Sequence, residues 1–323
     1  MDALNPELGL TLRVAGAVNA AAGIRQFELV APDGGELPEF SAGAHVLVQA
    51  PSGVTRRYSL CNAPEDRQRY VFAVKREASG RGGSISIVDG VHVGDAMHVS
   101  LPRNEFALGE AARSHLFIAG GIGITPIRSM VRHLEHAGSG SFKLCYLTRA
   151  PEVTAFREEF LAPHYRGSIV LHHDAGNPDD AFDLWPLLER PRQGTHVYCC
   201  GPSALMQSVR DMTGHWPTSA VHFEDFAVRA APRSPDDQPL HVRVGFDGDT
   251  VEVPARVSIL EALRARGYRI PSSCESGTCG SCRMKVRAGE PDHRDLVLTD
   301  AERRREMTVC VSRAHSPELV LEL

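Results

Sequence analysis

Four cysteines near the end of the chain constrain its fold more than any other feature. Cys274, Cys279 and Cys282 follow the spacing C-x4-C-x2-C, and Cys310 stands alone further along the chain. Three thiolates from one loop and a fourth from a distant segment are the ligands of one type of 2Fe-2S cluster. Structural zinc sites usually take their cysteines as two closely spaced pairs, so zinc is the less favoured alternative. We therefore predict that the last part of the chain folds around an iron-sulfur cluster.

The residues around these cysteines support this prediction. Gly277 and Gly280 lack a Cβ atom, which lets backbone N–H groups approach the cluster sulfurs. Residues 271–283 (PSSCESGTCGSCR) resemble the cluster loop of a plant-type ferredoxin of β-grasp fold. Disulfides are a weak alternative, because a large chain with no export signal belongs in a reducing compartment.

A linker is expected at residues 229–239 (RAAPRSPDDQP), which combine prolines with charges and show no apolar periodicity. After it, strands are expected at 242–246 and 250–253, followed by a helix that starts with a capping box at Ser258. We therefore expect residues 240–323 to form an α+β ferredoxin domain of β-grasp fold.

The part before the linker changes its pattern near residue 109. Residues 1–108 show short alternating segments between Pro, Gly and Asp turns, which predicts an antiparallel β-barrel. Residues 109–228 show apolar runs that alternate with helical patterns, which predicts an α/β domain with a parallel sheet. The chain is thus expected to be a multidomain protein with three different architectures.

Two turns of the middle domain predict a dinucleotide site. Residues 119–126 (AGGIGITP) follow a predicted strand and open a helix that Thr125 is expected to cap. Gly121 and Gly123 match the G-x-G pattern, although a proline replaces the third glycine, and an ordinary glycine-rich turn is the alternative. Residues 198–202 (YCCGP) end a later strand, and ligands of open parallel sheets bind at this carboxyl edge.

Together, these two turns resemble the pyridine-nucleotide domain of the ferredoxin reductase superfamily. The resemblance implies that Cys200 and Gly201 lie beside the nicotinamide and the flavin, and that Thr125 lines the same pocket. A buried strand cysteine is the alternative for Cys200.

Asp174 is expected to select the nucleotide. An acid at the carboxyl end of a strand can accept a hydrogen bond from the adenosine ribose and repel a 2′-phosphate, which favours NADH over NADPH. An exposed turn aspartate is the alternative. His172 and His173 precede Asp174, but adjacent strand side chains point to opposite faces, so we expect no metal site there.

Residues 56–62 (RRYSLCN) carry a flavin motif by resemblance, since R-x-Y-S matches that of the same superfamily. The resemblance implies that Arg56 or Arg57 binds the flavin phosphate, that Tyr58 packs on the isoalloxazine and that Ser59 hydrogen-bonds near its N5 atom. A basic β-turn followed by a half-buried tyrosine is the alternative.

A second glycine turn, residues 75–87 (KREASGRGGSISI), resembles the phosphate-binding segment of the FMN branch of the superfamily. Backbone N–H groups at a helix start can hold a phosphate. The candidate ligands are Lys75, Gly82, Gly83 and Ser84. By the same resemblance, Phe226 at the end of VHFEDF covers the other flavin face, and a core position is its alternative.

The order of flavin barrel, nucleotide domain, linker and ferredoxin resembles the phthalate dioxygenase reductase family. The resemblance implies FMN, NADH and a 2Fe-2S cluster as cofactors. Hydride would pass from NADH to FMN between Ser59 and Cys200, and single electrons would pass through the cluster to a terminal oxygenase, expected to be of Rieske type and to act on an aromatic acid or ether. An NADH-dependent redox sensor, a reductase serving a non-Rieske acceptor, and a non-redox protein with a structural metal are the alternatives.

Composition narrows the choice of partners. Lys plus Arg number 35 against 40 for Asp plus Glu, so a nucleic-acid partner is not expected. The apolar runs fall far short of the ~20 residues that a membrane helix needs, and the start lacks the pattern of a signal peptide. We expect a monomeric cytoplasmic protein that binds no membrane.

Overall fold

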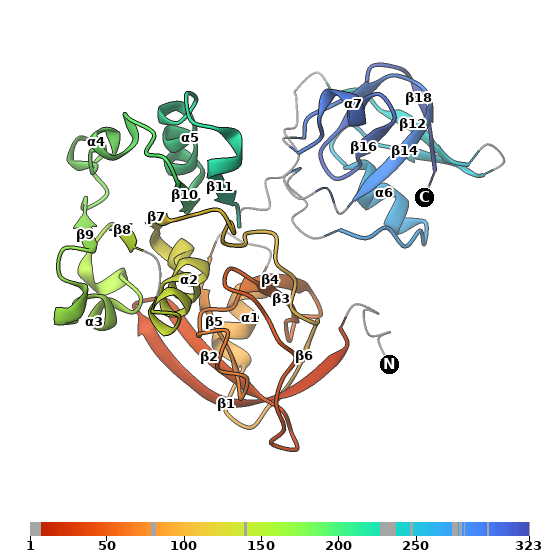
Figure 1. Cartoon of the computed structure of the whole chain (residues 1–323). Helices are drawn as coiled ribbons and strands as arrows, with labels where there is room; N and C mark the ends of the chain where they lie inside the picture. Colours follow the sequence, from red (N-terminus) through yellow and green to blue (C-terminus); the bar gives the residue numbers. More distant parts are fainter. Residues whose placement is uncertain are drawn as a thin grey trace. The chain divides into compact units, whose positions relative to one another are not determined.

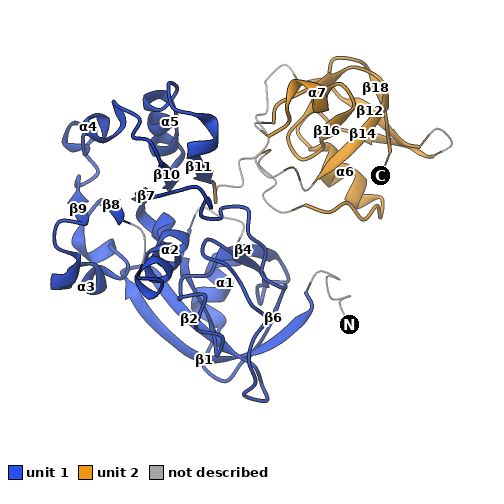
Figure 2. Cartoon of the chain, in the orientation of Figure 1, with its two compact units in different colours: residues 1–224 blue, residues 225–323 orange. Residues whose placement is uncertain are grey.

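The computed structural model describes residues 8–78, 82–138, 141–226, 237–245, 248–272, 277, 280, 282–295 and 297–322. The chain divides into two compact units, residues 1–224 and residues 225–323 (Figure 2). Most of the predicted linker at 229–239 lies outside the described residues. The expected boundaries of the three domains and the linker therefore stay a prediction.

A six-stranded antiparallel sheet forms the first half of the first unit (Figure 1). Its strand order is β4-β3-β6-β1-β2-β5. The elements are β1 (Leu10–Ala21), β2 (Ile24–Val30), β3 (His45–Gln49), β4 (Thr55–Ser59), β5 (Tyr70–Lys75), α1 (Gly83–Gly90) and β6 (Ala96–Val99). A bridge between Leu60 and Phe72 joins the two edges of the sheet, as expected for a barrel.

The barrel is held together by inward-facing apolar side chains. Alternate residues such as Phe27 and Leu29 of β2 and Val46 and Val48 of β3 are fully buried. Phe27 stacks on Phe72 with ring centroids 5.5 Å apart. Each such side chain contributes about 1.5–3 kcal/mol by leaving water.

A five-stranded parallel sheet, in the order β11-β10-β7-β8-β9, forms the second half of the first unit. Its elements are β7 (Ser114–Gly120), α2 (Ile124–His136), β8 (Ser141–Thr148), α3 (Arg157–Phe160), β9 (Ile169–His173), α4 (Trp185–Leu188), β10 (Thr195–Cys200), α5 (Ser203–Met212) and β11 (Val221–Glu224). The expected parallel sheet with crossover helices is confirmed.

The expected cap of α2 is wrong. The helix begins at Ile124, directly after a 3-10 turn (Gly121–Gly123), and Thr125 lies inside it. The Thr125 hydroxyl donates to the carbonyl oxygen of Ile122 at 3.1 Å instead of accepting from the helix. The 3-10 turn has already started the coil before the threonine, so no capping position is left for it.

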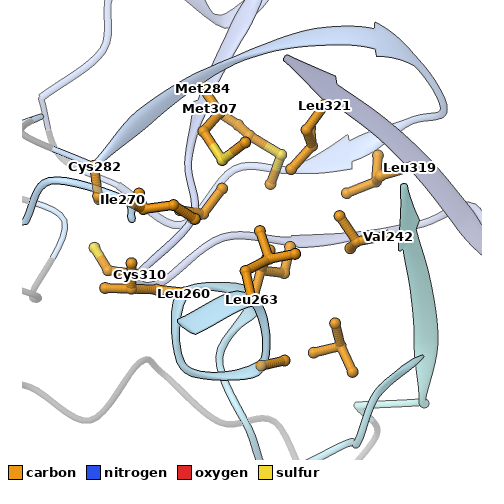
Figure 3. Close-up of a cluster of buried hydrophobic side chains, with 14 of the residues drawn as sticks. Val242, Leu260, Leu263, Ile270, Cys282, Met284, Met307, Cys310, Leu319 and Leu321 are labelled. Carbon is orange, nitrogen blue, oxygen red and sulfur yellow. The ribbon is translucent and has the colours of Figure 1, made fainter. Parts of the chain in front are cut away.

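The second unit is built on a mixed sheet in the order β13-β12-β18-β14-β16. Its elements are β12 (Leu240–Val244), β13 (Thr250–Val253), α6 (Ile259–Ala265), β14 (Arg283–Ala288), β15 (Pro291–Asp292), α7 (Asp300–Arg303), β16 (Glu306–Thr308), β17 (Arg313–Ala314) and β18 (Glu318–Glu322). The capping box of Ser258 and Glu261 at the start of α6 is confirmed. Leu260 and Leu263 of this helix pack into the sheet's buried cluster (Figure 3).

In the part of the chain that the structure describes, we find no helix long and apolar enough to cross a membrane.

Candidate functional site

Arg56 lies against the start of α1. Gly82 precedes the helix in the left-handed conformation (φ 83°); among the described residues, no side chain caps the helix and no atom lies within 4 Å of where a Cβ would lie. A Cβ on Gly83 would lie 2.8 Å from Cγ2 of Val54 and 3.3 Å from Cγ of Arg56. Arg56 therefore lies against the first turn of α1, where N–H groups lack partners within the helix. A guanidinium beside such N–H groups fits a phosphate.

Arg57 has different surroundings. Its Nη1 atom lies 3.0 Å from Oε2 of Glu105, and its side chain is mostly buried. Adjacent residues of a strand point to opposite faces, so Arg57 does not share the position of Arg56 beside α1. Of the two arginines, Arg56 is therefore the one beside the start of α1, and which of them binds the flavin phosphate stays a prediction.

Lys75 and Ser84 contact Glu77 rather than each other. The Lys75 ammonium lies 3.4 Å from Oε2 of Glu77, at the exposed end of β5. The Ser84 hydroxyl accepts a hydrogen bond from the Glu77 backbone N–H at 3.1 Å. These contacts hold the two ends of the glycine turn, and the roles of both residues in phosphate binding stay predictions.

Tyr58 and Ser59 are the last two residues of β4 and belong to the predicted flavin motif. The Tyr58 ring stacks on Phe72 at a centroid distance of 5.3 Å, and burial raises the pKa of its hydroxyl to about 12. The ring is therefore a neutral, half-buried platform of the kind that covers a planar cofactor. Ser59 is buried, and its hydroxyl donates to Oε2 of Glu224 at 3.2 Å.

Glu224 was not among the predicted site residues. It is the last residue of β11 and pairs in register with Cys200 of β10, so it connects the flavin motif to the nucleotide strand. Burial raises the pKa of Glu224 to about 7, against the opposing effects of Arg57 and Ser59. Its Oε1 atom has no hydrogen-bond partner among the described residues. An acid at the carboxyl end of the strand next to YCCGP is the signal that could have revealed it.

His45 was also missed. It pairs with Ser59 in the ladder of β3 and β4, and neither of its ring nitrogens has a partner among the described residues. Burial, with Arg57 and Arg103 nearby, lowers the pKa of His45 to about 3. His45 is therefore a neutral imidazole at physiological pH, next to Ser59 in the sheet.

The two nucleotide turns meet at one edge of the parallel sheet, as expected. A Cβ on Gly123 would lie 2.2 Å from the carbonyl oxygen of Cys200, and one on Gly201 would lie 2.9 Å from Cα of Gly120. Gly121 has a positive φ of 54°, and no atom of the described part of the chain lies within 4 Å of where its Cβ would lie. Such backbone contact is possible only without side chains, which explains the glycines.

The two neighbouring cysteines of β10 differ in their surroundings. Cys199 belongs to the buried apolar cluster of the parallel sheet. Cys200 is equally buried but lies beside Gly123 and Glu224. Ser59 from the antiparallel half of the first unit thus meets Glu224 of the parallel half, and Glu224 pairs with Cys200.

His172, His173 and Asp174 do not converge on one point. His172 Nε2 lies 2.7 Å from the carbonyl oxygen of Asp180, whereas His173 Nδ1 lies 2.8 Å from the Thr148 hydroxyl. No group of three metal-ligating side chains was found among the described residues. Asp174 accepts a hydrogen bond from the Gly176 N–H at 2.8 Å, just after β9, and its role towards the nucleotide stays a prediction.

Two of the four predicted cluster ligands, Cys282 and Cys310, lie within the described residues. Cys282 and Cys310 are both buried, and the Cys282 carbonyl oxygen accepts from the N–H of Val309 at 3.3 Å. Figure 3 shows both cysteines at the same side of the buried cluster. Cys274 and Cys279 lie outside the described residues.

The loop glycines fit a cluster. Gly277 and Gly280 have positive φ angles of 76° and 73°, and a Cβ on Gly277 would lie 2.7 Å from Cγ2 of Val311. Gly277 can therefore lie this close to Val311 only because it has no side chain.

Phe226 follows β11 and is half-buried. Its exposure does not test its predicted contact with the flavin.

Comparison with known proteins agrees with this geometry. Residues 117–211 match the oxidoreductase NAD-binding domain family, and residues 244–315 match the 2Fe-2S iron-sulfur cluster binding domain family. The chain is 52% identical over 312 residues to the phthalate 4,5-dioxygenase oxygenase reductase subunit of Pseudomonas putida, covering 97% of this chain and 96% of that protein.

Two solved structures extend the comparison. The structure of a phthalate dioxygenase reductase, described as modular for electron transfer from pyridine nucleotides to [2Fe-2S], is 52% identical, with a TM-score of 0.78 and coverage of 97% of this chain and 98% of that chain. A type IV self-sufficient cytochrome P450 monooxygenase is 37% identical, with a TM-score of 0.79, and this chain covers 41% of its length.

The predicted fold classes and cofactors are confirmed by these matches. The protein is an oxidoreductase with an NAD-binding and a 2Fe-2S domain, and its solved relative is described as transferring electrons from pyridine nucleotides to [2Fe-2S]. The chain therefore belongs to the phthalate dioxygenase reductase family.

Proposed function

We propose that this reductase passes electrons from NADH to a Rieske-type terminal oxygenase that acts on an aromatic acid or ether. The main support is the match over nearly the full length of a phthalate dioxygenase reductase subunit, flavin, nucleotide and ferredoxin regions included. The acceptor is then a separate protein, because that relative is one subunit of an oxygenase.

Residues at both halves of the first unit would hold the reacting groups. Arg56 and the N–H groups at Gly83 and Ser84 would bind the FMN phosphate, helped by Gly82 and Lys75. When bound, FMN can accept a hydride and give up single electrons, which suits a two-electron donor and a one-electron cluster. The residues of the first unit proposed to surround the ring and the nicotinamide are Tyr58, Ser59, Gly121, Gly123, Thr125, Cys200 and Gly201. Phe226, two residues after the first unit, is proposed by the family resemblance to cover the other flavin face.

The Ser59 hydroxyl and the Glu224 carboxyl group would hold or release a proton next to the flavin. A carboxyl group with a pKa near 7 can hold or release a proton at neutral pH, and its Oε2 atom lies 3.2 Å from the Ser59 hydroxyl. The hydroxyl can therefore donate to Glu224 or, when Glu224 is protonated, turn its own proton elsewhere. Uptake or loss of a proton by Glu224 can thus compensate a change of charge beside Ser59.

The ferredoxin unit would carry the cluster on Cys274, Cys279, Cys282 and Cys310. Thiolate ligands on one loop plus one distant cysteine suit this cluster type. We further propose that the protein is a cytoplasmic monomer that prefers NADH because of Asp174. The buried thiols of Cys61 and Cys145 are compatible with a reducing compartment.

A second acceptor class has support of its own. The similar region of a self-sufficient cytochrome P450 lies in one chain with its oxygenase, so this module also occurs with a non-Rieske acceptor. The two proposals differ only in the acceptor protein.

The test is anaerobic reduction of the purified holoenzyme. Flavin, iron and sulfide analysis should give one FMN and one 2Fe-2S cluster, and NADH should bleach both absorbances. A purified Rieske oxygenase should then be reduced faster than a cytochrome P450 at equal concentration. The reverse order would reject the Rieske acceptor, and a colourless protein that NADH does not change would reject the redox function altogether.

A further inference from the structure

Arg128 is a buried cation in the helix that opens with the nucleotide turn. It lies one turn after Thr125 in α2, and only 7% of it is exposed. Its Nε and Nη2 atoms lie 2.8 and 2.7 Å from Oε2 of Glu159, and its guanidinium covers the Phe156 ring at 4.0 Å from the centroid. Three different contacts therefore fix the orientation of the guanidinium plane.

The remaining edge of this guanidinium reaches Cys61 in the antiparallel half of the first unit, called the flavin half below because it carries the predicted flavin motif. Nη1 of Arg128 donates to the carbonyl oxygen of Cys61 at 3.2 Å and lies 3.5 Å from its sulfur. Cys61 is fully buried and follows Ser59 by two residues in the flavin motif. One side chain thus connects the helix of the nucleotide turn directly to the segment of Ser59.

The backbone that surrounds the Arg128 guanidinium adopts an unusual conformation. Phe156, which packs against the guanidinium, has a positive φ of 58°, a conformation that residues other than glycine rarely adopt. A rigid fork that is held on one edge by a carboxylate and on the other by a backbone carbonyl leaves little freedom for either partner.

Other contacts also join the two halves. The backbone N–H of Ala22 donates to the Glu152 carbonyl at 2.8 Å, and His133 lies 2.6 Å from Glu65 in a more exposed position. The halves therefore stay attached when Arg128 is replaced, and the loss would be one of precise placement.

We propose that Arg128 is a positioning residue for hydride transfer, which sets the flavin strand at Ser59 against the nicotinamide side at Thr125 and Cys200. This inference rests on the hydride pocket of the proposed function. A misplacement of about 1 Å between reacting groups can cost on the order of 100-fold in rate, so a single buried fork can control the reaction without touching it.

Arg132 is a matched control on the same helix. Its Nε atom lies 2.9 Å from Oε1 of Glu159, so it shares the carboxylate of Arg128. Among the described contacts, Arg128 alone of this pair hydrogen-bonds to Cys61. Comparing Arg128→Met with Arg132→Met therefore separates the connection to the flavin half from the loss of an ion pair with Glu159.

The test is anaerobic stopped-flow reduction of the holoenzymes over a range of NADH concentrations. R128M should lower the limiting rate of flavin bleaching by tenfold or more and change the apparent Kd for NADH by less than threefold. R132M should keep the limiting rate within twofold. The long-wavelength charge-transfer absorbance of the flavin with bound nicotinamide should weaken in R128M alone, because it depends on stacking and not on turnover.

Arg128→Lys keeps the proposal testable if R128M does not fold. Lysine retains the charge beside Glu159 but lacks the fork that also reaches Cys61. Its limiting rate should fall while its Tm stays within a few degrees of the unmodified protein. Equal limiting rates and equal charge-transfer absorbance in R128M and R132M, or an unchanged limiting rate in R128K, would overturn the inference. Failure of NADH to bleach the unmodified holoenzyme would instead overturn the proposed function.

Discussion

Replacing Glu224 by Gln should remove a pH dependence from the stability of the first unit. Glu224 is buried, and desolvation raises its pKa from 4.5 to about 7, although Arg57 and Ser59 act in the opposite direction. Gln has the same shape and can accept the hydrogen bond of Ser59, but it cannot ionise. The variant therefore isolates the titration of one carboxyl group.

The sign and size follow from linkage. The folded-state pKa lies above the unfolded value, so the neutral carboxyl favours the folded state and its contribution is fully present below pH 4.5. The contribution declines as the pH rises and is lost above the folded pKa of about 7. The difference, 7 − 4.5 = 2.5 units, corresponds to roughly 3 kcal/mol at about 1.4 kcal/mol per unit.

Tryptophan fluorescence can follow the first unit by itself. The chain has two tryptophans, Trp185 and Trp216, and both belong to that unit. Urea unfolding of flavin-free protein should be compared between the two forms from pH 5 to pH 8, because bound FMN would add its own binding free energy. E224Q should gain roughly 2.5 kcal/mol relative to the unmodified protein over this range, because part of the total change falls below it. A difference that stays constant with pH would refute the assignment of this buried titration to Glu224.

Three further predictions concern the cofactors. Arg56→Ala should weaken FMN binding by about 10- to 100-fold, the loss of a charged hydrogen bond, while Arg57→Ala should spare it; equal losses in a flavin fluorescence titration would contradict the assignment of the phosphate to Arg56. Asp174→Ala should raise kcat/KM for NADPH by about 5- to 100-fold through relief of repulsion, and an unchanged ratio of NADPH to NADH would remove Asp174 as the discriminator. Cys310→Ser should abolish the cluster absorbance, while FMN stays bound and NADH still bleaches the flavin absorbance. Loss of both cofactors would mean that the two units depend on each other for folding.

The features that could be predicted from the sequence are local ones. The C-x4-C-x2-C spacing, the glycine turns and the capping box at Ser258 depend on a few neighbouring residues, and short-range geometry determines what they can form. Strand periodicity likewise predicted the barrel and the parallel sheet. The wrong cap at Thr125 shows the limit of this approach, because a 3-10 turn before the helix moved its start by two positions relative to the expected cap.

Long-range pairs could not be predicted in this way. Ser59 and Glu224 are 165 positions apart, and their hydrogen bond requires the end of β4 to meet the end of β11. Periodicity predicts which face of a strand is buried. It does not predict which strand of the parallel sheet ends next to a given strand of the barrel. The contact between Arg128 and Cys61 depends on the same meeting of the two halves.

The choice between Arg56 and Arg57 was open for a related reason. Both lie in one strand, and the motif alone offers two arginines. The structure shows that their surroundings differ: Gly83 of α1 packs on Arg56, whereas Glu105 pairs with Arg57, and the preference for Arg56 as phosphate ligand is a proposal from this difference. Neither partner lies in the motif, so only the folded chain distinguishes the two.

The polar groups buried where the two halves meet argue that this boundary serves chemistry more than stability. Removing charged and polar groups from water is costly, and well-packed apolar side chains would hold two halves together at least as firmly. Among the described residues, the chain instead buries His45 without partners for its ring nitrogens, Glu224 with one oxygen unpaired, and Arg128 against Cys61. His45 pairs with Ser59 in the sheet, Glu224 accepts a hydrogen bond from it, and Arg128 donates to Cys61, which follows Ser59 by two residues. Their concentration around one hydroxyl is explained if the two halves must present a flavin and a nicotinamide to each other in a fixed, proton-balanced arrangement.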